Sequence, residues 1–394
     1  MVKVLLSCDD YAYLHNGRYY TKPDLMLFYQ RYLRVFDTVR VVCRCKEETT
    51  LADNRIPFDS DTRLELFPVP FFQGPKGYVK VFNRVGRSIV NAIEGCDAAI
   101  LRIPSTVALR VGKYAKKAGL PYACEVVFDA QDMLHNSKGI NKLVWKIIDN
   151  EMRELCSSAD GVSCVTEKYL QQHYYSNKSN AFTSNYSSIS LPKSFYSVNR
   201  TFPQNTTKVI AHIANQVQYE GRKGHVEIIY ALRELKRRNV SVIVRFAGQD
   251  YFGGVRKLQT LADELGVGNM IEFVGYLSRE SLDHFLNDAD MYVMPTRAEG
   301  LPRVIIEAMS KGLPCITTPV SGNPELVDSH FLVPYEDSLL LADRIEELFS
   351  DKKLYEQTSL NNFERSKKYE ASLLQSKRDE FYSKLKERAV EGNK

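Results

Sequence analysis

Short β-branched runs alternate with longer helical patterns along most of the chain, and this alternation constrains its fold more than any other feature. In the first half the runs lie at residues 2–7, 39–43, 98–101, 122–127 and 161–165, and the longest helical patterns lie at 24–35, 79–93 and 140–156. Strands that are apolar on both faces and are separated by helices are typical of parallel sheets covered on both sides. The sequence therefore predicts a doubly wound α/β fold.

A break at residues 176–207 divides this pattern. The segment loses its periodicity and fills with Ser, Asn, Thr and Pro, a composition that favours turns and a connector over a packed element. The alternation then resumes, with strands expected at 209–213, 242–246, 271–274, 291–294 and 314–316 and helices at 224–238, 254–265, 278–287 and 303–311. A chain of 394 residues also exceeds what one core usually serves. We expect two domains, 1–195 and 205–365, which face each other across a cleft at the carboxyl ends of their strands.

Charge and hydropathy indicate which kinds of partner and which location suit the chain. The formal net charge is +5, and the positive excess lies in the first 200 residues. This balance favours an anionic partner, but it does not distinguish a phosphorylated substrate from a lipid head group or a nucleic acid. The apolar start at residues 2–6 runs into Asp9 and Asp10, so no signal peptide is predicted, and no run approaches the roughly 18 apolar residues that a membrane-spanning helix needs. We expect a cytoplasmic protein, soluble or peripheral to a membrane.

The stretch 294–314 carries most of the recognisable chemistry. A strand ends, a loop turns at Gly300, and Pro302 stands where a helix can begin, because its missing N–H is harmless in the first turn. The unpaired N–H groups at 301–304 and the partial positive charge of the helix end form an anion site, to which Arg303 adds a cation. This pattern predicts the binding of a diphosphate.

Two glutamates belong to the same stretch, Glu299 in the loop and Glu307 in the helix. A carboxylate can accept hydrogen bonds from two vicinal ribose hydroxyls, which suits Glu307, whereas Glu299 would face a reacting sugar. The two residues also have a simpler interpretation. Glu299 can offset the partial positive charge of the helix end, and Glu307 can be a solvated helix residue.

The neighbouring residues resemble the signature of the retaining GT-B glycosyltransferases of family 4, the glycosyl transferases group 1. In that family the two glutamates are followed by Ala-Met, a Gly-x-Pro turn and a Gly-x-Pro-Glu segment; here these are Ala308-Met309, Gly312-Leu313-Pro314 and Gly322-Asn323-Pro324-Glu325. The likeness reaches back to about residue 208, and the chain is similar to members of the family that assemble polysaccharides. The first half resembles the family only loosely. It implies a GT-B fold, with two Rossmann-like parallel-sheet domains and a C-terminal helix at 372–390 that crosses back to the first domain. The buried stripe expected in this tail is Leu373, Leu374, Phe381 and Leu385.

The resemblance assigns roles on the donor side. Glu299 would lie beside the donor sugar as a catalytic residue, and Glu307 would bind the nucleotide ribose. The diphosphate would be held by Gly300, Leu301, Pro302 and Arg303. Lys223-Gly224 matches the family's Lys-Gly at the start of a helix, where the lysine neutralises the diphosphate.

One family feature is missing, the Gly-Arg at the end of the preceding strand. Asn215 or Gln216 takes its place here, and the missing charge would come from Arg222, Arg297 or Arg303. Tyr276 and Leu277 correspond to the nucleobase pocket of the family, which is lined mainly by backbone. Their side chains therefore do not indicate whether the donor is of the UDP or the GDP type.

No metal or other cofactor is expected. Asp288-Ala289-Asp290 resembles the Asp-x-Asp metal ligand of GT-A glycosyltransferases, but it precedes a buried strand at the close of a helix. The eight cysteines show no paired spacing, and most lie in apolar runs where a thiol acts as a small buried hydrophobe. No other cluster offers carboxylate or His ligands at metal spacing.

The acceptor side is less distinctive. The loop after the first strand often reaches the acceptor in such enzymes, which implies acceptor contacts for His15, Asn16, Gly17 and Arg18; Asn16-Gly17 is equally typical of a tight turn. Asp129 stands about where the family places a residue near the acceptor hydroxyl, so it is a second catalytic candidate, with helix capping as the alternative.

Residues 71–90 combine four cations with aromatic side chains. Such a segment can rest on an anionic leaflet, and a solvated helix face is the alternative. If the segment contacts the inner face of a membrane, a lipid-linked sugar is the expected acceptor.

The combined features predict a retaining glycosyltransferase that moves a hexose-type sugar from a nucleotide diphosphate sugar to a glycan or lipid-linked sugar, in polysaccharide or glycoconjugate assembly. Two alternatives stay open: a non-catalytic GT-B partner subunit that binds a glycan or nucleotide, and a sugar-nucleotide epimerase. Nucleic-acid binding is not expected, because no recognition motif accompanies the basic half.

Overall fold

The computed structural model describes residues 1–52, 54–197 and 200–392, and the chain divides into two compact units. The first unit holds residues 1–186 together with the chain from Gln375 onward, and the second holds Ser187–Leu374. Residues 187–195, assigned to the first domain from the sequence, therefore belong to the second unit. They are held there because Leu191 pairs with Glu370 in an isolated bridge and the Phe195 carbonyl accepts a hydrogen bond from the buried Lys311.

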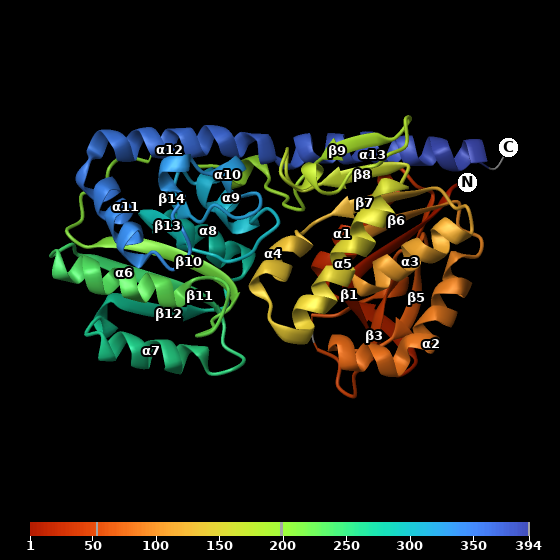
Figure 1. Ribbon diagram of the computed structural model, residues 1–394, viewed down its shortest axis with the longest axis horizontal. Coiled ribbons are helices and arrows are strands. Elements are labelled where there is room, and N and C mark those ends of the chain that lie inside the picture. Colours follow the sequence, from red (N-terminus) through yellow and green to blue (C-terminus); the bar gives the residue numbers. More distant parts are fainter. Residues whose placement is uncertain (53, 198–199, 393–394) are drawn as a thin grey trace. The chain divides into compact units, whose positions relative to one another are not determined.

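The first unit is built on a sheet whose core strands are all parallel, in the order β5-β3-β1-β6-β7-β8-β9 (Figure 1). These strands are β1 (Lys3–His15), β3 (Thr38–Glu47), β5 (Leu64–Pro70), β6 (Ala98–Ile103), β7 (Tyr122–Val126), β8 (Gly161–Cys164) and β9 (Phe182–Asn185). Two short antiparallel strands, β2 (Arg18–Thr21) and β4 (Ile56–Pro57), extend the sheet beside the far end of β1. Successive residues of β1 and β6 are fully buried, as a sheet covered on both faces requires.

Strand β9 corrects one expectation, because it lies within the stretch 176–207 that was assigned to turns and a connector. It is an edge strand of mostly polar residues that pairs only with β8, and its one buried side chain, Phe182, packs against Phe381. One apolar residue among Ser, Thr and Asn gives no hydrophobic periodicity from which a strand can be predicted.

Helices connect the strands of the first unit. They are α1 (Pro23–Gln30), η1 (Tyr32–Arg34), η2 (Phe58–Ser60), α2 (Gly74–Ile93), α3 (Thr106–Lys117), α4 (Ala130–Asn136), α5 (Gly139–Ser157) and η3 (Leu170–Gln172). Helices α2, α3 and α5 lie over one face of the sheet (Figure 1). Gly112 of α3 lets that helix approach closely, since a Cβ there would come within 3 Å of Leu101 on β6 and of Leu155 on α5.

The C-terminal helix α13 (Ala371–Gly392) covers the other face of this sheet with the part that follows Leu374. Its buried stripe includes the expected Leu374, Phe381 and Leu385, but Leu373 is 51% exposed, and Tyr382 and Ala389 complete the stripe instead.

A buried carboxylate on β7 explains why this helix packs there. Glu125 accepts hydrogen bonds from the hydroxyls of Tyr382 (2.6 Å), Tyr186 (2.8 Å) and Tyr32 (3.0 Å) and pairs with Arg102 (2.6 Å). Burial raises the pKa of Glu125, but Arg102 and the tyrosine hydroxyls outweigh it and lower that pKa overall. The ion pair is thus compensated inside the fold.

The second unit contains a five-stranded parallel sheet in the order β12-β11-β10-β13-β14. Its strands are β10 (Lys208–Gln216), β11 (Val242–Gln249), β12 (Ile271–Gly275), β13 (Met291–Met294) and β14 (Cys315–Thr317). Its helices are α6 (His225–Arg237), α7 (Gly254–Glu264), α8 (Arg279–Asn287), α9 (Arg303–Ser310), α10 (Asn323–Leu326), α11 (Ser338–Ser350) and α12 (Lys352–Ser366), with short η4 (Lys193–Phe195), η5 (Gly268–Met270), η6 (Ser329–Phe331) and η7 (Lys367–Tyr369) turns. Every strand and helix expected between residues 208 and 317 is present.

Within the described ranges, no helix combines the length and apolar character needed to cross a bilayer.

Candidate active site

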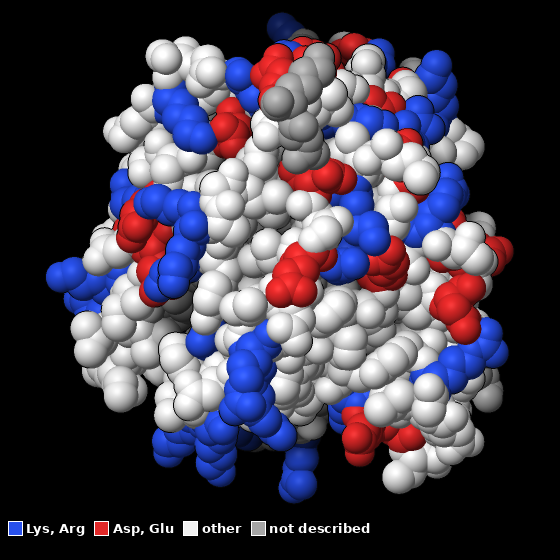
Figure 2. Space-filling view, turned by 90° about the vertical axis from the view of Figure 1, so that its right-hand side faces the viewer, with Lys and Arg blue, Asp and Glu red and all other residues white. Residues whose placement is uncertain are grey.

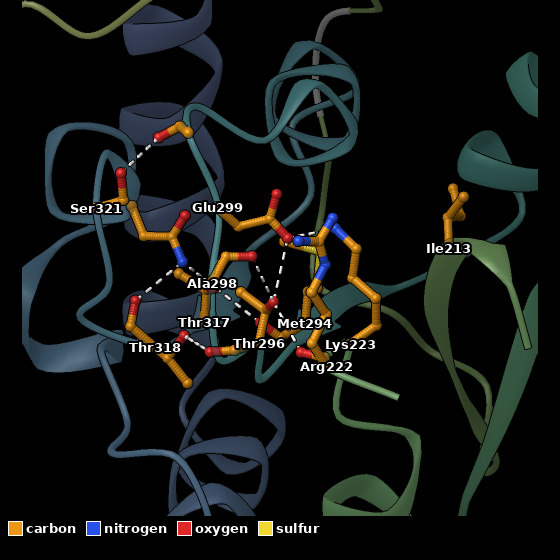
Figure 3. Close-up of polar contacts among 12 residues, drawn as sticks. Ile213, Arg222, Lys223, Met294, Thr296, Ala298, Glu299, Thr317, Thr318 and Ser321 are labelled. Carbon is orange, nitrogen blue, oxygen red and sulfur yellow. Dashed lines mark hydrogen bonds and ion pairs between the residues drawn. The ribbon is translucent and has the colours of Figure 1, made fainter. Parts of the chain in front are cut away.

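The candidate site of the second unit lies at the carboxyl ends of β10 and β13. The loop after β10 ends at Lys223 and Gly224, directly before α6, and the loop after β13 carries Glu299. Lys223 Nζ and Glu299 Oε1 form an ion pair that joins the two loops (Figure 3). Glu299 is buried and Lys223 is partly exposed, so the pair presents its cationic side to solvent. The sequence-predicted diphosphate lysine and catalytic glutamate are therefore direct neighbours.

Gly224 makes this close approach possible. Its φ of 82° lies in the left-handed region, and a Cβ at this position would lie 2.8 Å from the Pro295 carbonyl carbon and still closer to the carbonyl oxygen. Any larger residue would both strain the backbone and push the two loops apart.

Thr296 is a site residue that the sequence did not reveal. Its hydroxyl lies 2.9 Å from the Arg222 carbonyl oxygen and 3.1 Å from Glu299 Oε1 (Figure 3). The same Arg222 carbonyl accepts a second hydrogen bond from the Arg297 amide (2.8 Å). Thr296 thus orients the glutamate and links the loop after β13 to the loop after β10.

A buried polar layer supports the loop before α9. Thr318 Oγ1 donates to the Thr296 carbonyl (2.6 Å), and Ser321 Oγ and the Gly322 amide donate to the Gly300 carbonyl (3.1 and 3.0 Å). Asn323, the first residue of α10, donates from Nδ2 to Thr317 Oγ1 and to the Thr318 carbonyl, both at 3.0 Å. Asn323, at the variable position of the Gly-x-Pro-Glu motif, thus holds the segment that shapes the site.

Helix α9 begins directly after this loop, with Pro302 as its N-cap residue. Its first amides have no acceptor within the helix, and its end carries a partial positive charge. Arg303 is exposed beside them, whereas Leu301 and Pro302 are buried. Burial raises the pKa of Glu307, an effect that Arg303 and Arg279 oppose. Glu307 therefore lies in a protected position one turn into the helix, where its carboxylate can accept hydrogen bonds.

The remaining predicted donor residues follow strand ends at the same edge of the sheet. Gln216 ends β10, and its Oε1 accepts a hydrogen bond from Gln218 (2.7 Å). Tyr276 and Leu277 follow β12, and Tyr276 is 71% exposed. Arg222 is exposed beside Lys223, but the guanidinium of Arg297 pairs with Glu336 (2.9 Å) and stacks on Tyr335. Which of the three arginines replaces the missing Gly-Arg stays a prediction.

Two buried histidines lie beneath the lysine and had no signal in the sequence. His212 of β10 donates from Nδ1 to the Val293 carbonyl of β13 (2.8 Å), and its ring lies 4.5 Å from that of His225, the first residue of α6. Because a carbonyl can only accept, this bond fixes the tautomer of His212. Burial, together with the charge of Lys223, lowers the pKa of His212 to about 4, against the opposing effect of the bond to Val293. Burial, His212 and Lys223 place the pKa of His225 well below its usual value.

In the first unit, Asn16 and Gly17 form the tight turn between β1 and β2, both with positive φ (48° and 76°). His15 Nδ1 donates to the Glu48 carbonyl (2.9 Å), and Arg18 pairs with Asp59 (2.8 Å). The turn interpretation is confirmed, and an acceptor role for these four residues stays a prediction.

Asp129 takes the capping role that the sequence left as the alternative. It is the N-cap residue of α4, accepts a hydrogen bond from the Gln131 amide (2.9 Å) and another from the Tyr174 hydroxyl (3.0 Å), and is fully buried. Among the residues that the structure covers, no group of three or more His, Cys, Asp or Glu is placed to hold a metal ion.

Known proteins resemble this chain in sequence. Residues 200–365 match the family model of the glycosyl transferases group 1. The chain is 24% identical to protein CapJ of Staphylococcus aureus over 93% of its own length and 91% of that protein. It is 34% identical to the colanic acid biosynthesis glycosyltransferase WcaL of Salmonella typhimurium over 135 residues, about a third of each chain.

Solved structures show the same architecture over nearly the whole chain. Sucrose-phosphate synthase of Thermosynechococcus elongatus aligns with a TM-score of 0.74 at 14% identity, covering 98% of this chain and all of the other. HepE of Anabaena in complex with UDP and glucose aligns with a TM-score of 0.65 at 18% identity, over 96% and 99% of the two chains.

The fold is therefore that of the GT-B glycosyltransferases. More particularly, residues 200–365, which hold the Lys223–Glu299 pair and helix α9, are a glycosyl transferases group 1 domain.

Proposed function

We propose that this chain transfers a sugar from a nucleotide diphosphate sugar of the UDP or GDP type to a glycan or lipid-linked sugar acceptor, with retention of anomeric configuration. One observation carries the proposal: the Lys223–Glu299 pair stands beside the amide-rich start of α9, at the carboxyl end of a doubly wound sheet. Ligands of such sheets bind at that edge.

The donor's diphosphate is assigned to Lys223, Arg303 and the first amides of α9. An ammonium group has three N–H donors, so Lys223 can hold Glu299 with one and a diphosphate oxygen with another. These groups stabilise the charge that develops on the departing diphosphate. Glu307 accepts the ribose hydroxyls, and Tyr276, Leu277 and Gln216 line the nucleotide end. The UDP and glucose bound to HepE support a nucleotide sugar as the donor class.

In the reaction, the bond between the anomeric carbon and the diphosphate oxygen breaks, and the acceptor oxygen bonds to the same carbon from the same face. The acceptor proton passes to the departing phosphate, so no protein base is required. Glu299 positions the donor sugar. The protein contributes mainly orientation and electrostatic stabilisation.

The acceptor is assigned to the first unit, with His15, Asn16, Gly17, Arg18 and Asp129 as the contacting residues. We place the protein at the inner face of the membrane, in peripheral contact through residues 71–90. Its likeness to the colanic acid biosynthesis glycosyltransferase WcaL supports a place in polysaccharide or glycoconjugate assembly.

A thermal-shift screen across nucleoside diphosphates and their sugars tests the donor assignment, because a ligand that binds only the native state raises the melting temperature. A UDP or GDP compound is expected to raise it, and Lys223→Ala is expected to abolish the shift. Product formation with the same donor excludes the non-catalytic alternative, whereas the absence of any nucleotide-dependent shift would refute the proposal.

A further inference from the structure

The first unit contains a cavity of about 750 Å³ at the carboxyl edge of its sheet. Asp9, which follows the part of β1 that pairs with β6, and Pro104, which follows β6, both line it. Strand β1 lies between β3 and β6, so the order of the strands reverses at this point of the sheet. Ligands of open α/β sheets bind outside the carboxyl ends of the strands at such a switch point. The position of the cavity therefore suits a ligand.

The lining of the cavity combines aromatic rings and hydroxyl groups with charged side chains. Three cations and two carboxylates contribute to it. Two of the cations are neutralised, because Arg44 pairs with Asp9 (2.6 Å) and Lys113 pairs with Glu151 (2.5 Å). The third, Arg110, pairs with no carboxylate that the structure describes. The cavity thus carries one positive charge without a counter-ion.

Aromatic side chains hold Arg110 in place. Its Cζ lies 3.6 Å from the centroid of the Phe82 ring, and its Nη1 donates to the Tyr78 hydroxyl (3.1 Å). Gly86 of α2 leaves the space that the guanidinium occupies, since a Cβ there would lie 3.2 Å from Arg110 Cζ and still closer to Nη2. Arg110 is half-buried, and a charge in such a place is costly without a partner, so a bound anion would stabilise it.

Arg44 supplies a second unsatisfied donor. It lines the cavity, is 7% exposed, and its Cζ lies over the rings of Tyr11 (4.3 Å) and Phe72 (5.1 Å). Its Nη1 donates to the Phe72 carbonyl (3.2 Å) and its Nη2 to Asp9 (2.6 Å), but its Nε has no acceptor within the described ranges. Buried N–H groups nearly always have a partner, so an oxygen atom of a ligand would complete this one.

The surroundings of the cavity also favour an anion. Helix α2, which contributes Tyr78 and Phe82 to the lining, carries four cations and no carboxylate. Figure 2 shows Lys and Arg side chains gathered at the lower left of one face of the molecule, at the level where α2 lies in Figure 1. Charges of one sign raise the local concentration of oppositely charged ligands.

We propose that this cavity binds a sugar that carries an oxyanion, either a carboxylate or a phosphate, and that this acidic sugar belongs to the acceptor. Arg110 binds the anion with two parallel N–H groups, as arginine does with both kinds of oxyanion, and Arg44 Nε binds a further oxygen. The aromatic rings cover the sugar ring, and the hydroxyls of Tyr78 and Thr106 bind its hydroxyl groups. The inference rests on the proposed function, because it names the class of acceptor that the first unit takes.

The fluorescence of Trp145 provides the test, because this residue is the one tryptophan of the chain and lines the cavity. The full-length protein is titrated, without a nucleotide, with glucose and galactose, with their uronic acids, with their 6-phosphates, and with inorganic phosphate. At least one acidic sugar is expected to bind about tenfold more tightly than its neutral parent, since a hydrogen bond to a charged group contributes at least that factor. The tighter class, uronic acid or sugar phosphate, identifies the anion.

Two results would overturn the proposal at this stage. One is equal affinity for the neutral and all the acidic sugars. The other is inorganic phosphate that binds as tightly as the best acidic sugar, which would mean an adventitious ion only.

Substitutions that remove one cation each locate the anion. Arg110→Met keeps an unbranched side chain against Phe82 but has no charge, so it is expected to abolish the preference for the acidic sugar and to retain the affinity for the neutral one. Arg110→Lys keeps the charge without the planar fork and should retain part of the preference. The matched control is Arg87→Met, which removes an exposed cation of α2 outside the lining and should bind as the wild type does.

Far-UV circular dichroism checks that the variants are folded. A preference that survives in Arg110→Met, or that Arg87→Met loses to the same extent, would overturn the proposal. None of these titrations uses a donor or measures transfer. A protein that binds the acidic sugar but transfers nothing would contradict the proposed function alone, and transfer without the preference would contradict this inference alone.

Discussion

Replacing Gly224 by alanine tests whether the two site loops are held together as the structure shows them. The left-handed φ costs an L-residue about 1–2 kcal/mol. The new Cβ would also overlap the Pro295 carbonyl, so the loops must separate. Separation breaks the two hydrogen bonds to the Arg222 carbonyl, from Thr296 and from the Arg297 amide, each worth about 1 kcal/mol. The free energy of unfolding should therefore fall by about 3–4 kcal/mol.

Gly266 offers the matched control. Its φ of 70° is also left-handed, but the nearest atom to an added Cβ is Lys236 Nζ, at 3.9 Å. It follows the C-terminal end of α7 and lies away from the site loops. Gly266→Ala should cost only the backbone term, about 1–2 kcal/mol, and the effect of alanine on the unfolded chain is common to both variants. The difference between them, about 2 kcal/mol, isolates the contact with Pro295.

Denaturant titration of both variants measures the free energies of unfolding, and thermal shift with a nucleoside diphosphate measures donor binding. Gly224→Ala is expected to lose the ligand shift, because Lys223 moves with its loop, while Gly266→Ala keeps it. If the two variants are equally stable and bind the ligand equally well, the close approach of the two loops is not a feature of the folded protein.

Other predictions concern single groups of the site. Lys223→Ala and Glu299→Ala should each lower the turnover rate by a factor of about 10²–10³ in a folded protein. Near-normal rates for both variants would refute the site assignment. Thr296→Val should lower stability by about 1–2 kcal/mol and weaken donor binding, measured by denaturation and thermal shift, while Thr296→Ser restores both because it keeps the hydroxyl. The pKa of His212 is about 6.5 in the unfolded chain and about 4 in the folded one, so between these pH values only the unfolded chain takes up a proton. The contribution of His212 should therefore lower the free energy of unfolding by about 2 kcal/mol from pH 7.5 to pH 5. His212→Asn should flatten that pH dependence, and an unchanged slope would mean that the histidine is not buried in its neutral form. Asp129→Asn keeps the helix cap but removes the charge, so retained stability with lost turnover would support the catalytic role, and retained turnover would leave capping as its only role.

The strands of the second unit could be predicted because each is a short apolar run between clear helical patterns. The loops that carry Lys223 and Glu299 could be placed for the same reason, as parallel strands align their carboxyl ends. The contact between the two residues could not, because it depends on the left-handed turn at Gly224 and on side chains such as Thr296 that carry no periodic signal. The buried histidines were missed since a lone His in an apolar run has the pattern of any core residue.

In the first unit and the helix that returns to it, the sequence could not decide the outcome at two residues. The sequence pattern assigns both Leu373 and Leu374 to the buried stripe, but adjacent residues of a helix point about 100° apart, and only Leu374 is buried. Asp129 follows a strand end as a catalytic residue would, and it also caps α4 and accepts a hydrogen bond from Tyr174, 45 positions away. A catalytic role for it stays a prediction, and such a distant partner cannot be identified from local sequence.

The return of α13 to the first unit makes that unit discontinuous in sequence, which has a consequence for folding during synthesis. The second unit is one continuous segment, Ser187–Leu374. The first unit lacks the Tyr382 hydroxyl, which donates a hydrogen bond to Glu125, until α13 has been synthesised. Domains generally fold as units during synthesis, with the N-terminal one first. We expect this chain to reverse that order: nascent chains arrested before Gln375 should resist protease in their second unit while their first unit is still cut.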